Sequence, residues 1–499
     1  MAKPRTLVPR NGYLQALIIV MLLAVLFRFV ALMTLPPGLS SGEARIGLAA
    51  FNLLHHGVWP NFGLASGGSP LLVWLEVLAI QLFGTAPWIL RLVPAAIGIG
   101  ATWWLYLWAE QWFGKRTAVM AALLLAVTPW SVTLSRNVEP AALAPLLLAS
   151  LFYFSTRLWH GRSLRRALPL TVVAAFAALA GPVGWGALAT VAIVGLVTIL
   201  GHPRRPNLKF SGLGLAAGLL ALAPAVVIAL SQRDLSAVLH LPDLGKVGAG
   251  ALSTLLAFQI HGDTNFLHNL GGEPLLNVFI GIMFVAGVLI TATRWPHRTD
   301  RALLVAGFAA LLPALLSPQT APDAARLSLA LPGALILSAL GIGYMLEVWY
   351  ATFPINSAAR LTGQISIMIL LGLTVYQGYT QYFVAWAHSS ETQRVYGDTP
   401  LGMAQWVRSQ PAKAPQIIVA TPSEQFGLQY GLLNRQNYQL VSASHLTTAL
   451  AVRPLHLVVS PSLRDQAVTA LKTSAPGGTL NVHQSTFDQA DLYYTYDLP

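Results

Sequence analysis

The chain has 499 residues, of which 55% are apolar and only 10% are charged. Soluble domains carry about 45–50% apolar and about 25% charged residues, so this composition excludes an ordinary soluble fold and indicates a protein built for lipid. The absence of cysteine excludes disulfides and thiolate metal sites. The net charge of +12 is no sign of nucleic-acid binding, because the cations lie in short loops where membrane topology explains them.

Apolar stretches of membrane-spanning length recur along the first three quarters of the chain. The first, Tyr13 to Leu35, is too long for a signal-peptide core and is followed by Pro36-Pro37-Gly38 rather than a cleavage site, so we expect it to remain as a span. About eleven spans are predicted, near residues 13–35, 87–109, 117–134, 140–156, 168–182, 184–201, 211–230, 274–293, 302–317, 328–349 and 361–384.

The charges of the loops predict one orientation in the membrane. The N-terminus and every second loop are basic, which is typical of cytoplasmic segments. The alternate loops, 36–86, 135–139, 231–273 and 318–327, hold most of the acids of this half and are predicted to be external. The chain is therefore expected to be a multi-pass cell-membrane protein with a cytoplasmic N-terminus and an external C-terminal segment.

The composition changes after about Ala385. Residues 386–499 have ordinary polarity and contain no stretch long enough to span. Short β-rich runs at 417–420, 456–459 and 492–496 alternate with helical patterns at 401–409, 424–433 and 462–473, which favours a compact α/β unit. We expect a membrane domain over 1–385, including its external loops, and a small external α/β domain over 386–499.

Short motifs recur at fixed places along the membrane half. They are Pro36-Pro37-Gly38 with Gly42-Glu43, Ser69-Pro70-Leu71-Leu72, Phe83-Gly84 with Arg91-Leu92-Val93-Pro94, Thr128-Pro129-Trp130 with Leu134-Ser135-Arg136, His261-Gly262-Asp263-Thr264-Asn265 with His268-Asn269-Leu270, and Pro322-Asp323-Ala324-Ala325-Arg326. In this order and placement they resemble the GT-C glycosyltransferases, in particular the branch of protein mannosyltransferases and aminoarabinose transferases. The resemblance implies a mostly α, GT-C-like helix bundle.

The resemblance also implies an activity. Its members move a sugar from a polyprenyl-phosphate-linked donor to an external acceptor, which is a protein, a lipid or a glycan. Such a transfer needs a carboxylate to remove the proton of the acceptor, and cations or a divalent metal to neutralise the departing phosphate. The chain departs from the family at Gly42, where an aspartate is usual. Two alternatives therefore stay open: a catalytically degenerate scaffold that binds lipid-linked glycans, and a transporter or flippase.

Glu43 is the candidate catalytic acid, because it is the acid that remains at this motif. Its alternative role is to cap a helix or to pair with Arg45. Arg136, Arg326 and Arg91 are candidates for binding the donor phosphate, since a guanidinium suits bidentate contact with phosphate. Their alternative roles are anchoring at the membrane interface and pairing with nearby acids, such as Asp323 for Arg326.

The loop over 261–269 contains further candidates. His261, Asp263 and His268 have side chains that bind zinc or manganese, although their spacing matches no strict metal motif. Asn265 and Asn269 lie in the same loop, and the alternative is a loop held by Asx turns and histidine hydrogen bonds. Arg28 lies inside the first span, where a charge needs an internal partner.

Overall fold

The computed structural model describes residues 10–58, 68–160, 163–200, 244–316 and 322–411, and most of 416–498 with gaps at 434, 436, 442–445, 447–454, 475–476 and 486–488. These residues form two compact units. The first unit comprises Met1–Leu32, Asn61–Leu75 and Arg91–Trp386, and the second comprises Met33–Pro60, Glu76–Leu90 and Ala387–Pro499.

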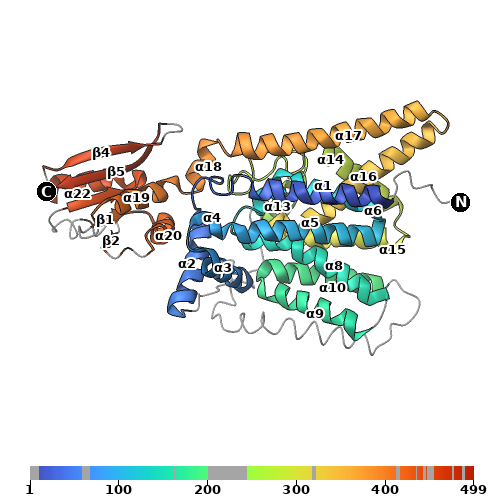
Figure 1. Cartoon of the computed structure of the whole chain (residues 1–499), viewed down its shortest axis with the longest axis horizontal. Helices are drawn as coiled ribbons and strands as arrows, with labels where there is room; N and C mark the ends of the chain where they lie inside the picture. The colour runs from blue at the N-terminus through green and yellow to red at the C-terminus, as the bar shows by residue number, and fades with distance from the viewer. Residues whose placement is uncertain are drawn as a thin grey trace. The chain divides into compact units, whose positions relative to one another are not determined.

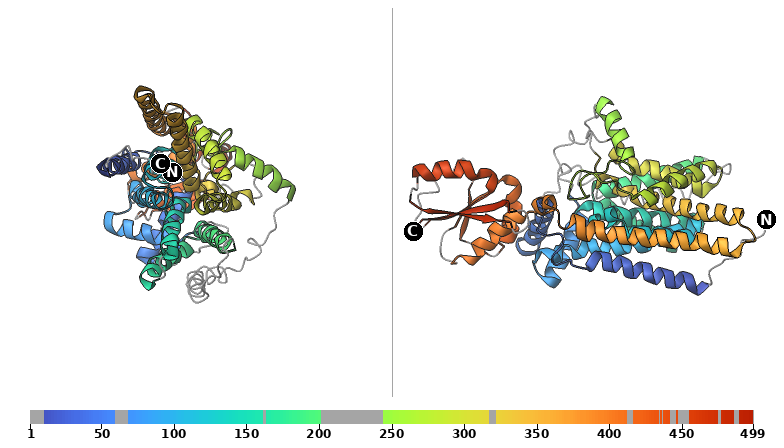
Figure 2. Two further views of the ribbon diagram at one scale, coloured as in Figure 1. Left: turned by 90° about the vertical axis from the view of Figure 1, so that its right-hand side faces the viewer. Right: turned by 90° about the horizontal axis from the view of Figure 1, so that it is seen from above.

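The first unit is a bundle of helices that run alongside one another (Figures 1 and 2). Its centre is formed by α1 (Arg10–Phe29), α5 (Leu92–Phe113), α6 (Lys115–Val127), α8 (Leu143–His160), α14 (Val278–Thr293) and α16 (Leu331–Thr352). Further members are α9 (Leu164–Leu179), α10 (Pro182–Leu200), α13 (Leu244–Leu256), α15 (Arg298–Leu315) and α17 (Ser357–Tyr379), which continues into the π-helix η4 (Thr380–Trp386). Short elements at the helix ends are α7 (Pro129–Leu134), η2 (Pro140–Ala142) and η3 (Arg326–Leu329).

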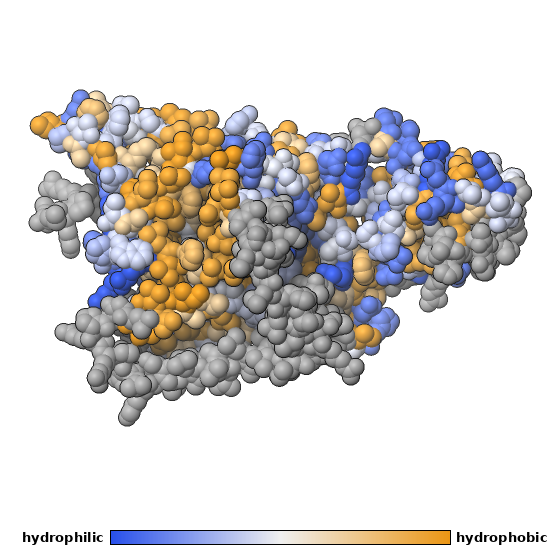
Figure 3. All heavy atoms as spheres, turned by 180° about the vertical axis from the view of Figure 1, so that it is seen from behind, coloured by the Kyte–Doolittle hydropathy of each residue, from blue (hydrophilic) through white to orange (hydrophobic). Residues whose placement is uncertain are grey.

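Six helices of the described chain are long and apolar enough to cross a membrane: Gly12–Phe29, Pro87–Phe113, Pro140–Trp159, Pro182–Ile199, Leu331–Thr352 and Ser357–Trp386. Their outward side chains are large and apolar, and Figure 3 shows a hydrophobic surface over the bundle. Each predicted span within the described residues overlaps a helix or two consecutive ones, although the first, 13–35, runs past the end of α1 at Phe29. The predicted span 211–230 lies outside the described residues.

Two buried arginines satisfy the carbonyl groups at two helix ends. Pro129 has no N–H, so the helix breaks between α6 and α7, and the last carbonyls of α6 need another donor. Arg28 on α1 supplies it, donating to Leu125 O at 3.1 Å and to Ala126 O at 2.9 Å. In return Arg136, after α7, donates to Phe27 O at 3.1 Å and to Val30 O at 2.8 Å at the end of α1. The expected internal partner of Arg28 is thus a helix C-terminus.

The second unit combines α2 (Ser41–His56), the second half of α3 (Pro70–Phe83) and α4 (Pro87–Leu90) with the C-terminal domain. That domain starts with α18 (Ser390–Val395) and α19 (Asp398–Ser409). A five-stranded sheet follows, in the order β2-β1-β3-β5-β4, in which β1 (Gln416–Val419) pairs in parallel with β2 (Tyr438–Val441) and β3 (Leu455–Val459). The strands β4 (Thr479–Gln484) and β5 (Asp491–Leu498) complete it in antiparallel pairing.

Helices cover both faces of this sheet, because alternate strand residues point to opposite sides. Ile418 and Val458 pack against α19 and α20 (Pro422–Gly431), whereas Ile417 and Leu457 face the core that includes α22 (Arg464–Ser474). The predicted strands and helices of this domain are confirmed. The short strands β2 and β4 were not predicted. The described segments of 33–60 and 76–90 group with this unit rather than with the membrane domain to which the sequence analysis assigned them.

Candidate functional site

Glu43 is fixed at the start of α2 in the second unit. Ser40 is the N-cap of this helix, and its hydroxyl accepts the Glu43 N–H at 3.2 Å while Glu43 Oε2 accepts the Ser40 N–H at 3.0 Å. This reciprocal capping box holds the carboxylate in one orientation. Glu43 is fully buried. The capping role foreseen as an alternative is therefore observed, and the carboxylate is rigidly placed.

Gly42 leaves space beside Glu43. Among the described residues, a Cβ placed on Gly42 would meet only Ser40 Oγ, at 4.0 Å, and the glycine does not adopt a left-handed conformation. An aspartate at this position therefore needs no rearrangement of the backbone. Arg45, two residues further along α2, is exposed.

Two helices of the second unit carry buried polar atoms that have no hydrogen-bond partner among the described residues. They are both carboxylate oxygens of Glu76 on α3 and the hydroxyl of Tyr430 on α20. Burial raises the pKa of Glu76 well above its ordinary value, and the nearby charge of Glu43 raises it further. Burial and then the charge of Glu76 raise the pKa of Tyr430 as well. Electrostatics thus link Glu43, Glu76 and Tyr430, which come from three different helices.

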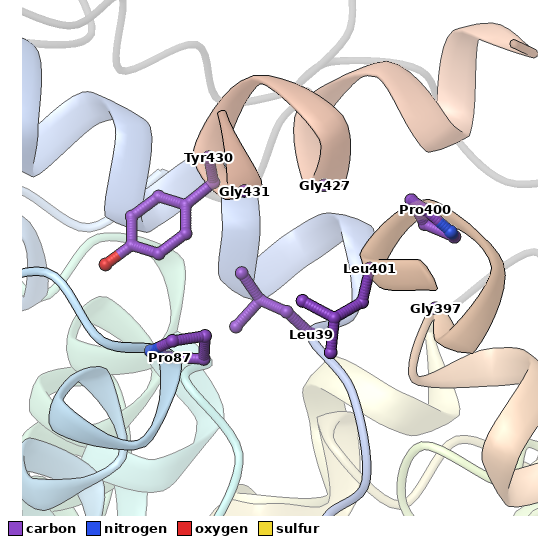
Figure 4. A pocket seen from close by; sticks show the side chains of 8 residues that line it. All are labelled: Leu39, Pro87, Gly397, Pro400, Leu401, Gly427, Tyr430 and Gly431. Carbon is purple, nitrogen blue, oxygen red and sulfur yellow. The ribbon is translucent and has the colours of Figure 1, made fainter. Parts of the chain in front are cut away.

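A small hollow lies beside these helices (Figure 4). It is lined by Leu39, Pro87, Gly397, Pro400, Leu401, Gly427, Tyr430 and Gly431. The hydroxyl of Tyr430 is directed away from Leu39 and Leu401, so the hollow itself is apolar (Figure 4). The ring of Tyr430 also covers Gly47, where an added Cβ would lie 2.7 Å from the tyrosine ring. A glycine at this position is what lets α20 approach α2, one helical turn beyond Glu43.

A second polar cluster lies in the loops of the first unit. His268 bridges two acids, with Nε2 at 2.8 Å from Glu139 Oε2 and Nδ1 at 3.2 Å from Asp263 Oδ2. Asp263 also accepts the N–H groups of Asn265 at 2.7 Å and Ala324 at 2.9 Å. The cluster therefore joins the loops that carry Glu139, Asp263 and Ala324.

The charge of His268 explains this arrangement. Burial lowers the pKa of His268, but the charges and hydrogen bonds of Glu139 and Asp263 outweigh burial and raise it to about 10. A protonated imidazole donates from both nitrogens and has no lone pair for a metal. Asp263, His268 and Asp323 lie close enough together to share an ion. Because their ligand atoms already hold hydrogen bonds or ion pairs, we assign no metal there, and the Asx-turn alternative describes the loop.

The remaining candidates in these loops differ in exposure. Asp323 Oδ1 caps the backbone of Ala325 and Arg326, and its Oδ2 pairs with Arg326 Nε at 3.2 Å. The side chain of Arg326 keeps 39% of its surface exposed. His261 is exposed as well. Asn269 is buried and donates to the carbonyls of Asp263 and Glu273.

Arg136 and Arg91 are buried, unlike Arg326. The guanidinium of Arg136 holds the end of α1 and lies 5.2 Å from the ring centre of Tyr382 and 5.3 Å from that of Phe383. Arg91 is 2% exposed at the start of α5. The observed contacts give Arg136 a structural role. Arg326 is thus the candidate cation whose position suits contact with a ligand.

Sequence reasoning did not single out Glu76, Tyr430 or Glu139. A signal for Glu76 was present, because it occupies the apolar stripe of the Pro70–Phe83 helix at the spacing of Leu72 and Ile80. Tyr430 and Glu139 carry no comparable signal, since their neighbours come from distant parts of the chain.

Known proteins match this chain both in sequence and in structure. A family profile described as dolichyl-phosphate-mannose-protein mannosyltransferase matches residues 67–230. The Bacillus subtilis (strain 168) protein named "Putative mannosyltransferase YycA" is 32% identical to this chain over 83 residues. That segment is 16% of this chain and 12% of YycA.

The structural matches extend over nearly the whole chain. ArnT from Cupriavidus metallidurans, solved with bound undecaprenyl phosphate, superposes with a TM-score of 0.62 at 15% identity, and 98% of each chain is covered. The archaeal oligosaccharyltransferase AglB from Archaeoglobus fulgidus, solved with an inhibitory peptide and a dolichol-phosphate, has a TM-score of 0.58 at 16% identity. That match covers 97% of this chain and 74% of AglB.

At these identities the structural matches establish the fold, which is the GT-C fold of membrane glycosyltransferases, and the predicted fold class is confirmed. The family profile matches only residues 67–230 and the match to YycA covers 16% of the chain, so these findings make the chain similar to the mannosyltransferases, as its loop motifs predicted.

Proposed function

We propose that this protein is a glycosyltransferase that moves a sugar from a polyprenyl-phosphate-linked donor to an acceptor on the external face of the membrane. The observation that carries the proposal is the fold match over 98% of both chains to ArnT, a protein solved with undecaprenyl phosphate bound. The match to AglB, solved with a dolichol-phosphate, supports the same donor class. The external location rests on the alternation of basic loops.

Glu43 is the base of the proposed reaction. Its carboxylate accepts the proton of an acceptor hydroxyl while the acceptor oxygen forms a bond to the anomeric carbon. The bond from this carbon to the phosphate oxygen breaks, and its electron pair leaves with the polyprenyl phosphate. A rigidly held base favours such a transfer, because no reorientation is needed as the proton moves. The capping box provides that rigidity.

Arg326 is the proposed contact for the departing phosphate. Its side chain is partly exposed, and its Nε pairs with Asp323 Oδ2 at 3.2 Å. The planar guanidinium presents several N–H donors in a fork that matches phosphate oxygens. The buried Arg136 donates to the carbonyls of Phe27 and Val30, which favours Arg326 over Arg136 for this contact.

A second candidate function is a non-catalytic protein that binds lipid-linked glycans. Two observations favour it: the acid usual in the family is replaced by Gly42, and the carboxylate of Glu43 is engaged in capping α2. This scaffold would bind the same donor as the enzyme and would not turn it over.

One assay separates the two functions. Purified full-length protein in liposomes is given radiolabelled mannosyl polyprenyl phosphate, with membrane extracts divided into protein, lipid and glycan fractions as acceptors. Transfer of label into one fraction is the expected result. Saturable donor binding without transfer from this or other polyprenyl-phosphate sugars would identify the scaffold, and neither binding nor transfer would refute the donor class.

A further inference from the structure

Arg326 is held in place through the backbone of Ala324. This alanine is buried, and side chains from two other segments bind both of its polar backbone groups. Its N–H donates to Asp263 Oδ2 at 2.9 Å, and its carbonyl accepts the indole N–H of Trp130 on α7 at 3.0 Å. Asp323, the residue before Ala324, accepts the Arg326 N–H at 3.2 Å and pairs with Arg326 Nε at 3.2 Å. The contacts that fix Ala324 therefore also fix the start of the Arg326 side chain.

His268 fixes the orientation of Asp263. Its Nδ1 lies 3.2 Å from Asp263 Oδ2, the oxygen that accepts the Ala324 N–H, and its Nε2 lies 2.8 Å from Glu139 Oε2. Ionised carboxylates only accept hydrogen bonds, so an imidazole bonded to two of them donates from both nitrogens and carries a positive charge. A chain of charge-assisted hydrogen bonds thus runs from Glu139 through His268 and Asp263 to Ala324.

The same imidazolium lies close to Asp323, the ion-pair partner of Arg326. Ligand atoms of Asp263, His268 and Asp323 lie within 4.8 Å of one another. Together with Glu139 and Arg326, this cluster contains three carboxylates and two cations. Without the charge of His268 the three acids would share one cation, and their attraction would draw the Arg326 guanidinium toward them. The charge of His268 reduces this attraction, and 39% of the Arg326 side chain is exposed.

We propose that His268 is a positioning residue for the donor phosphate, which acts through Asp263 and Ala324 to hold Arg326 where its guanidinium meets the departing phosphate. This inference rests on the proposed contact between Arg326 and the polyprenyl phosphate. A binding group that is held by supporting hydrogen bonds has less freedom to lose when its ligand arrives, so its affinity is higher. The contribution of His268 is therefore to donor affinity, and it is transmitted by hydrogen bonds rather than by contact with the donor.

The test is a double-mutant cycle between His268→Gln and Arg326→Ala, with the Kd for undecaprenyl phosphate in detergent measured below the Tm of each variant. Glutamine keeps a hydrogen-bond donor but carries no charge. We expect His268→Gln to raise Kd roughly 10-fold when Arg326 is present and less than about 3-fold in the Arg326→Ala background, because residues that act through one another are not additive. His268→Lys, which restores the cation, should recover part of the affinity. Equal changes in the two backgrounds would mean a general structural role and would overturn the inference.

Trp386→Phe is the matched control. It removes the bond from Trp386 Nε1 to the Phe266 carbonyl, 2.9 Å long, in the same loop as His268, and it leaves the Asp263 carboxylate unchanged. This variant should have a lower Tm and the Kd of the wild type. A Kd raised as much as in His268→Gln would show that any loosening of the loop weakens binding, which would also overturn the inference.

A second variant covers the case in which His268→Gln does not fold. Trp130→Phe keeps an aromatic ring but releases the carbonyl of Ala324, and it should raise Kd in the same Arg326-dependent way. An unchanged Kd would show that the position of Ala324 does not matter to binding, against the inference. Equal Kd values for Arg326→Ala and the wild type would refute the phosphate contact and this inference with it, whereas no binding by the wild type would refute the donor class.

Discussion

The carboxylate of Glu43 closes the capping box of α2 and is also the base of the proposed reaction, and one substitution separates the two roles. Glutamine also completes a capping box at this position, so Glu43→Gln should fold normally. Turnover should fall by roughly 10²–10⁴-fold while donor binding persists. Initial rates and Tm measure both effects. Glu424→Gln is the control, since Glu424 holds the same position in the capping box of α20, and it should retain full activity.

Gly42→Asp restores the acid that the family usually carries at this site. The free space around Gly42 predicts that this variant folds with the stability of the wild type. We expect its rate of transfer to equal or exceed that of the wild type, because a second acid is added beside Glu43. Transfer that appears only in Gly42→Asp would identify the natural chain as a scaffold.

Arg326→Ala should weaken binding of a polyprenyl phosphate without affecting folding. Loss of one charge-assisted contact corresponds to about 1.5–3 kcal/mol, or roughly 10- to 100-fold in Kd. Arg394→Ala is the matched control, because Arg394 is likewise exposed and paired with an acid three residues away. Equal affinity in both variants, measured by titration of the protein in detergent with undecaprenyl phosphate, would remove Arg326 from the site.

His268 makes the stability of the loop cluster depend on pH. Its folded pKa of about 10 lies above the value of about 6.5 for an unfolded histidine. The stabilisation is therefore fully present below about pH 6.5 and is lost as the pH rises through about 10. We expect Tm to fall over this window in the wild type and to fall less in His268→Gln. The variant should be about 3 kcal/mol less stable at pH 6, since it leaves Glu139 and Asp263 without their cation. Parallel Tm curves would contradict this assignment.

At the scale of helices, Arg28 compensates for the proline that breaks the helix between α6 and α7. Arg28→Met keeps much of the volume but leaves the carbonyls of Leu125 and Ala126 without donors. We expect a loss of about 3 kcal/mol, measured by thermal unfolding in detergent. Arg157→Met, which removes an exposed bond to the Tyr153 hydroxyl, should change stability little. Gly98→Ala should resemble Arg28→Met, because its Cβ would lie 2.4 Å from Arg28 Nε and from Ser135 Cβ.

At the scale of the whole molecule, the alternation of basic loops predicts the side of the membrane on which each segment lies. Reporter fusions after Arg166 and after Lys209 should be cytoplasmic, whereas fusions after Asn265 and at Pro499 should be external. Each loop after residue 230 is placed on its side of the membrane by counting the predicted span 211–230, so these fusions also test that span. A cytoplasmic reporter at Pro499 would refute both this topology and the external location of the site.

Hydrophobic length and loop motifs were sufficient to predict the helices and the fold class. A membrane span must satisfy its backbone internally, so twenty apolar residues leave little choice but a helix. Strand and helix periods were sufficient for most of the C-terminal domain. The strands β2 and β4 escaped because they are short, at four and six residues, and lie at the two edges of the sheet, where little of β4 is buried.

The sequence by itself determined that this is a polytopic GT-C-like protein and that Glu43 follows the first helix. These features follow from local composition and order along the chain. Only the tertiary structure decided which polar groups act together. Burial and neighbours determine charge, and both are set by distant segments: Glu139 makes His268 a cation, and Tyr382 and the end of α1 enclose Arg136.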